Sequence, residues 1–110
     1  MNFYIGNSLN EIKMDDYNIE FSDDLLQYIY THRKRIPVDS NVLFEVDPYS
    51  DTLIAHENVE EIRNICSLCI TTRIIENYDD YDEAIEMIYD LLQLANSALL
   101  NKKGLIIMGD

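Results

Sequence analysis

Basic residues are scarce in this chain of 110 residues, which holds 8 Lys and Arg against 21 Asp and Glu. The formal net charge is −13 at pH 7, and a field of that sign repels nucleic acid and anionic membranes and attracts basic partners. A disordered acidic tail is excluded, because 47% of the residues are hydrophobic and 8 of them are tyrosines. The composition therefore predicts a folded domain that carries a strong negative field.

Glycine, proline, cysteine and tryptophan are few as well, at three, two, two and none. So few glycines leave little material for a phosphate-binding loop, and the sequence contains no GxGxxG, P-loop or HExxH motif. Two cysteines do not make a disulfide framework. No segment approaches the ~20 apolar residues of a membrane span, and the first residues lack the basic and apolar regions of a signal peptide. We therefore expect one cytoplasmic domain over residues 1–110 that needs neither metal nor disulfide to fold.

The first helix is predicted over roughly residues 22–35. Ser22 is a favourable N-cap, two aspartates follow it, and the basic run 33–35 comes at the end, so that both ends complement the helix dipole. Pro37 ends the helix. Because the dipole explains the basic run sufficiently, we expect no direct contact with nucleic acid there.

Two longer helices are predicted in the second half of the chain. Residues 58–61 and 80–83 both have the spacing of a capping box, and each is accompanied by a stripe of mainly apolar residues that share one face at helical spacing. The stripes consist of Val59, Ile62, Cys66, Cys69, Ile70 and Arg73, and of Tyr81, Ala84, Ile85, Ile88, Leu91, Leu92, Ala95 and Leu99. Two lysines favour the end of the last helix, and Gly104 is expected as its left-handed cap.

Short strands are predicted at both ends of the sequence. Residues 105–108 are too apolar to be left unpaired, and residues 2–5 are the obvious neighbour. Between these strands, residues 42–46 are predicted to form a buried strand or a short helical turn. Residues 47–51 are predicted to form a turn, and residues 52–55 a strand that returns from it. The fold class expected is α+β: a mostly helical single domain with about three helices and a small sheet.

Cysteine and histidine offer little chemistry in this pattern. Cys66 and Cys69 have CxxC spacing, but they fall inside a predicted helix and not at its start, where a thiol pKa would be lowered. A zinc site needs four ligands, and no second pair exists, so we interpret both as buried small hydrophobic residues. His32 and His56 are interpreted as solvated or capping. We expect no cofactor, no metal and no enzymatic activity. A small enzyme that uses paired carboxylates as acid and base is a further hypothesis, but carboxylates are so abundant in this sequence that no single pair can be identified as catalytic.

Two tyrosines are interspersed among four acids in residues 78–83, which we interpret as a patch that faces a partner. A calcium loop does not fit, because the required glycine and the glutamate at the twelfth position are missing. Helix capping with a solvated first turn is the alternative. Tyrosine is a common interface anchor. The candidate partner-binding residues are Asp47, Tyr49, Asp51, Glu57, Glu60, Tyr78, Asp79, Asp80 and Asp82.

Four features together resemble small bacterial immunity proteins of polymorphic toxin and contact-dependent growth-inhibition systems. They are the small size, the acidity, the segment LFEVDPYSDT at 43–52 and the ending NKKGLIIMGD at 101–110, and the resemblance covers residues 42–110. It implies a stoichiometric inhibitor of a cognate toxin domain. Many such toxins are nucleases, whose basic clefts an acidic protein occupies by presenting carboxylates where phosphates would sit. An acidic adaptor or regulatory protein that binds a basic segment of another protein is the alternative.

Overall fold

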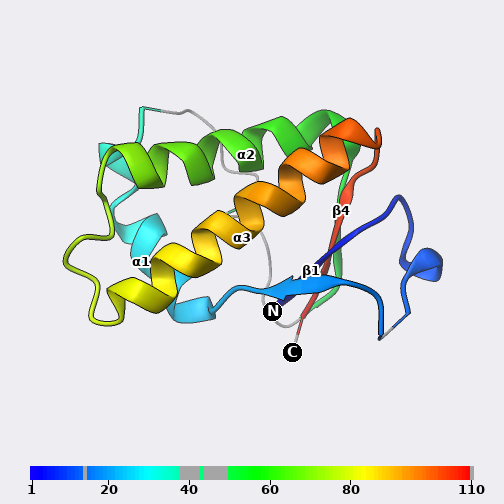
Figure 1. Ribbon diagram of the computed structural model, residues 1–110, viewed down its shortest axis with the longest axis horizontal. Coiled ribbons are helices and arrows are strands. Elements are labelled where there is room, and N and C mark those ends of the chain that lie inside the picture. Colours follow the sequence, from blue (N-terminus) through cyan, green and yellow to red (C-terminus); the bar gives the residue numbers. More distant parts are fainter. Residues whose placement is uncertain (14, 38–42, 44–49, 110) are drawn as a thin grey trace.

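Three α-helices and four short strands form the part of the chain that the structure describes, residues 1–13, 15–37, 43 and 50–109 of a computed structural model (Figure 1). The α+β prediction is therefore confirmed. In chain order the elements are β1 (Asn2–Ile5), the 3-10 turn η1 (Leu9–Glu11), β2 (Asn18–Glu20), α1 (Asp23–Thr31), the 3-10 turn η2 (Arg33–Arg35), β3 (Thr52–Ile54), α2 (His56–Thr71), α3 (Tyr81–Leu100) and β4 (Leu105–Met108).

The strands form one antiparallel sheet in the order β2-β1-β4-β3. The predicted pairing of the two terminal strands is confirmed, with Asn2 opposite Met108 at one end and Ile5 opposite Leu105 at the other. The two ends of the chain consequently lie near each other (Figure 1). The returning strand is also confirmed as β3, whereas the alternatives for 42–46 and the turn at 47–51 lie almost wholly outside the described residues. Sequence patterning missed β2, which has three residues and one buried side chain.

The hydrophobic core lies between the sheet and the helices. Alternate strand residues such as Phe3, Ile54 and Ile107 join it, because successive side chains of a strand point to opposite faces. The helices α2 and α3 pack against each other and run in opposite directions (Figure 1). The predicted stripes largely match their buried faces, but Tyr81 is 42% exposed and Arg73 lies past the end of α2.

The predicted first helix is shorter than expected, because α1 ends at Thr31 and the basic run forms the separate turn η2. Two side chains that follow α1 form hydrogen bonds with carbonyl groups of its last turn. His32 Nδ1 lies 2.9 Å from the Tyr28 oxygen, and the Arg33 guanidinium donates to the Tyr30 oxygen at 2.9 Å. Arg33 also lies over the Tyr30 ring, 4.0 Å from its centroid. These contacts satisfy carbonyl groups that a helix end leaves open.

The predicted capping box at residues 58–61 is wrong. The helix α2 begins at His56, with Ala55 at the N-cap position, so Glu57 is the acid of its first turn and Asn58 lies inside the helix. At α3 the prediction is half right. Asp80 does occupy the N-cap position, but its side chain makes no capping hydrogen bond.

Gly104 is not the left-handed residue that ends α3, since that conformation belongs to Lys102 with a φ of 55°. The Lys102 N–H donates to the Leu99 oxygen at 3.2 Å and the Lys103 N–H to the Ala98 oxygen at 2.9 Å. These two bonds form a Schellman motif. Gly104 is required for another reason: a Cβ there would collide with the backbone oxygen of Ile54 in β3.

Candidate functional site

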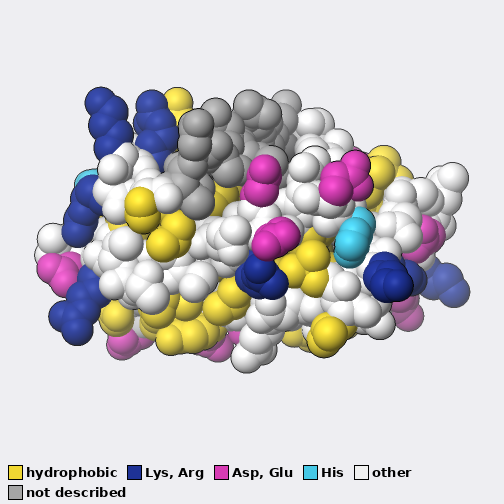
Figure 2. Space-filling model, turned by 90° about the horizontal axis from the view of Figure 1, so that it is seen from above, with side chains coloured by type: hydrophobic (Ala, Val, Ile, Leu, Met, Phe, Trp, Pro, Cys, Tyr) yellow, Lys and Arg dark blue, Asp and Glu magenta, His cyan; other side chains and the backbone are white. Residues whose placement is uncertain are grey.

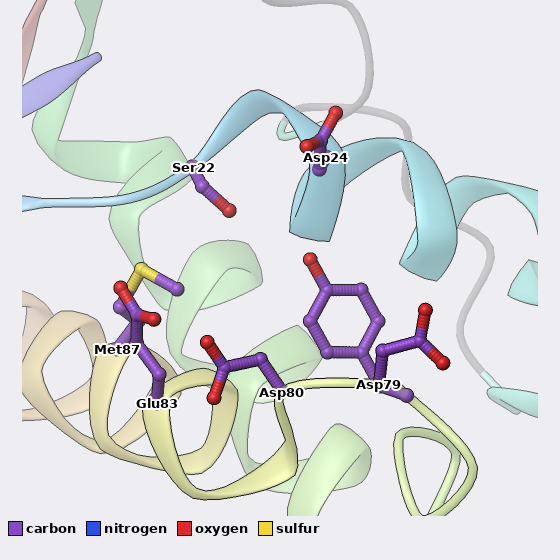
Figure 3. Close-up of a pocket in the computed structure, with 7 residues that line it drawn as sticks. Ser22, Asp24, Asp79, Asp80, Glu83 and Met87 are labelled. Carbon is purple, nitrogen blue, oxygen red and sulfur yellow. The ribbon is translucent and has the colours of Figure 1, made fainter.

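A pocket of about 540 Å³ opens between the start of α1 and the start of α3 (Figure 3). Its lining is mostly acidic and comes from two segments that are far apart in the sequence. The lining residues are Ser22, Asp24, Tyr78, Asp79, Asp80, Glu83 and Met87. It is the candidate functional site of the described part of the chain.

Two helix starts position these side chains. The Ser22 hydroxyl oxygen accepts a hydrogen bond from the Leu25 N–H at 3.1 Å, which begins α1 and places Asp24 in its first turn. Asp80 holds the N-cap position of α3, and Glu83 follows in the first turn. The positive end of a helix dipole favours acids at such positions, so local helix energetics already explain part of the charge.

The carboxyl groups of Asp80 and Glu83 lie next to each other on the α3 side of the pocket, whereas Asp79 points away from them (Figure 3). Asp80 raises the pKa of Glu83, first because it accepts a hydrogen bond from the protonated Glu83 and second because its negative charge repels the ionised form. Smaller contributions of the same sign come from Glu20 and Glu86. Among the described residues, no Lys or Arg forms an ion pair with a carboxylate of this pocket. The pocket therefore carries negative charge that nearby cations do not balance.

Tyr78 supplies an aromatic wall beside these acids. Its ring meets the Tyr28 ring edge to face, with centroids 5.1 Å apart, and the Tyr28 ring lies 4.3 Å from the His32 ring. Aromatic pairs of this geometry are favourable and hold the ring in place. Carboxylates beside a fixed tyrosine ring suit a guanidinium or ammonium group, which pairs with the acids and stacks on the ring.

The structure brings only some of the predicted partner-binding residues together. Tyr78, Asp79 and Asp80 line the pocket, and Asp82 is exposed in the first turn of α3 without lining it. Of the remaining described candidates, Asp51 precedes β3, and Glu57 and Glu60 lie in the first turns of α2, at the end of that helix far from the start of α3 (Figure 1). That helix has 16 residues, or about 24 Å at 1.5 Å per residue. Asp47 and Tyr49 lie outside the described residues.

The separated candidates also have partners of their own. Glu60 accepts a hydrogen bond from Arg63 at 3.1 Å, and Asp51 accepts one from the Gly109 N–H at 3.2 Å. Sequence patterning did not place Ser22, Asp24 and Met87 in the site, whereas Glu83 belongs to the predicted patch at residues 78–83. The sequence pattern that could have indicated the site is an N-cap residue followed by acids at two helix starts. Sequence neighbours alone do not show that these two helix starts meet in the fold.

The cysteines and histidines of the described chain do not indicate a nucleophilic or metal site at this pocket. Burial raises the pKa of both cysteine thiols, that of Cys69 to about 12, and both lie in the core face of α2 as predicted. His56 has a buried Nε2 atom without a hydrogen-bond partner, and neither histidine lines the pocket. Within residues 1–13, 15–37, 43 and 50–109, no three His, Cys, Asp or Glu side chains are grouped to hold a metal ion.

No helix in the described part of the chain is both long and apolar enough to cross a bilayer. Comparisons with known protein families, with curated proteins and with solved structures found no match to this chain. Any function is therefore inferred from the chain's own charge and geometry.

Proposed function

We propose that this chain is an immunity protein, which binds and neutralises a cognate bacterial toxin domain by taking a basic surface of that domain into its acidic pocket. The observation that carries the proposal is the pocket itself, where acids from two helix starts meet beside Tyr78 and form no ion pair with a described Lys or Arg. The net charge of −13 means that the whole molecule, and not only the pocket, attracts basic partners. Isolated acids on a surface would not suffice, but a concave acidic site with an aromatic wall suits a basic side chain.

Two physical contributions to binding are expected. The overall negative field steers a basic partner and raises the association rate, and this effect weakens as salt screens it. Residence in the complex depends on anchors that lose their water, and Tyr78 with the Asp80–Glu83 pair supplies them. A nuclease toxin fits best, because its phosphate-binding cleft already gathers Lys and Arg, to which these carboxylates present the charge of a phosphate.

Proton release on binding follows from the raised pKa of Glu83. A partner cation beside Glu83 favours its ionised form and lowers the pKa of that carboxyl in the complex. Over the pH range between the two pKa values the free protein binds more protons than the complex does. Affinity therefore rises with pH through that range.

The test uses the toxin domain encoded beside this chain and two triple variants that remove the same charge. The pocket variant is Asp79→Asn, Asp80→Asn, Glu83→Gln, and the matched control, at three acids that do not line the pocket, is Asp51→Asn, Glu57→Gln, Glu60→Gln. We expect the pocket variant to weaken binding at least about tenfold and the control about threefold or less. Equal losses would place the interface elsewhere. A complex with no protection from the toxin would favour an adaptor, and no complex would overturn the proposal.

A further inference from the structure

One flank of α3 carries an apolar stripe at the edge of the core, three residues of which are exposed. Tyr81, Ile85 and Tyr89 repeat every four residues, so they lie on one face of the helix. Tyr81 is 42% and Tyr89 46% exposed, while Ile85 is partly buried against the core. The same face continues with Leu92, which is partly buried against the core, the polar Asn96, and Leu100, which is 85% exposed.

The stripe ends in a groove of about 350 Å³ between α2 and α3. Its lining consists of Arg63, Asn96, Leu99 and Leu100. Arg63 pairs with Glu60 at 3.1 Å, so the groove has no unbalanced positive charge from that side chain. A side chain of the size of leucine could enter it and contact Leu99 and Leu100.

A row of acids runs beside the stripe. Asp82, Glu86 and Asp90 directly follow the three stripe residues Tyr81, Ile85 and Tyr89, which sets the acids about 100° further round the helix. Figure 2 shows hydrophobic side chains in several patches, one of them along the lower edge of the view, and Lys and Arg side chains at both ends and near the middle. An apolar row with an acidic row beside it is complementary to a helix that has one apolar face and one basic border.

We propose that this α3 stripe, from Tyr81 to Leu100, docks a basic amphipathic helix of a partner protein. The stripe is about 28 Å long at 1.5 Å per residue, the length of a helix of about 19 residues. Its anchors would be apolar residues three and four apart on the partner, one of which enters the groove at Leu99 and Leu100. Lysines or arginines along the partner's border would pair with the acidic row.

Charge decides between this occupant and others. A second copy of the chain would bring another net charge of −13 against the same acidic row. An anionic membrane surface is disfavoured for the same reason. The surface also differs from the acidic pocket, because Glu83 and Met87 lie on the opposite flank of α3 from the stripe. The proposal therefore does not rest on the proposed immunity function.

The test uses three synthetic 18-residue peptides and isothermal titration at physiological salt. One is an amphipathic Leu/Lys helix, the second has the same composition in a scrambled order that forms no apolar face, and the third replaces Lys by Glu. We expect micromolar binding of the first and at least about tenfold weaker binding of the second and third. Equal binding of the first and second peptides would overturn the proposal, because charge alone would then explain it.

Matched variants locate the binding surface. Tyr89→Ala with Leu100→Ser should weaken binding of the Leu/Lys helix about tenfold. The same two changes at Tyr17 and Leu9, which are 74% and 47% exposed outside α3, should alter it by less than about twofold. Asp80→Asn with Glu83→Gln should also change it by less than about twofold, which separates this surface from the pocket. Equal losses in the Tyr17 and Leu9 control, or a concentration-dependent dimer that the Tyr89 and Leu100 variant abolishes, would overturn the proposal.

Discussion

The carboxyl group of Asp80 lies beside that of Glu83 at the start of α3 and raises the pKa of Glu83. Both residues are at positions where the helix dipole favours an acid, yet together they repel each other. Neither is neutralised by a described Lys or Arg. Under the proposed function, a partner that brings positive charge would relieve this repulsion.

Replacing Glu83 by Gln should raise the melting temperature at pH 7. The native pKa of Glu83 lies above its unfolded value, so the native state binds more protons between the two values. Stability is therefore lost as pH rises through that window, which begins near the ordinary glutamate pKa of about 4.3. The difference between the variant and the parent should vanish below the window. Thermal melts from pH 3.5 to 7.5 measure it, with Glu76→Gln in the exposed α2–α3 connection as the control; a lower melting temperature for Glu83→Gln at pH 7 would contradict it.

Replacing Gly104 by Ala should destabilise the fold by about 2–3 kcal/mol, because the added methyl group meets the backbone oxygen of Ile54, which cannot move without shifting β3. Gly6 is the matched control. A Cβ there lies 3.0 Å and 3.1 Å from the tips of Ile106 and Ile12, side chains that can adjust. Gly6→Ala should therefore cost about 1 kcal/mol or less in urea unfolding. Equal losses at the two positions would be inconsistent with this packing.

Replacing Lys102 by Gly should stabilise the protein by about 0.5 kcal/mol, because Lys102 holds a left-handed conformation that costs a lysine more than a glycine. Lys103→Gly removes the same charge one residue later, where φ is not positive. We expect no gain from this control. Chemical denaturation of both variants decides the matter, and a loss of stability in Lys102→Gly as large as that in Lys103→Gly would argue against the Schellman geometry.

Both thiols should be inert in the native protein. Burial raises the pKa of Cys66 and Cys69, and the thiolate is the reactive form. A thiol reagent at pH 8 should modify neither cysteine until denaturant is added, when both should react. Cys66→Ser should also destabilise by about 1–3 kcal/mol, since it buries a hydroxyl group, while the exposed neighbour Ser67→Ala should change little. Rapid native labelling would contradict the burial of these residues.

The features that the sequence predicted correctly are local, or follow from a strong apolar pattern. Ser22 caps α1 through its neighbour Leu25, and residues 105–108 are so apolar that pairing with the other terminal strand was the simplest outcome. The role of Gly104 could not be predicted, because it depends on an oxygen of Ile54, 50 residues earlier in the chain. Likewise the pocket forms only because α1 and α3 meet, and sequence spacing does not show that contact.

Inhibition of the cognate toxin domain at equal molar amounts tests the central claim most directly. We predict that the chain abolishes toxin activity at a 1:1 ratio, and that Asp79→Asn, Asp80→Asn, Glu83→Gln restores activity at concentrations where the control triple variant still inhibits. Full toxin activity in the presence of a tenfold excess of the chain would contradict the account.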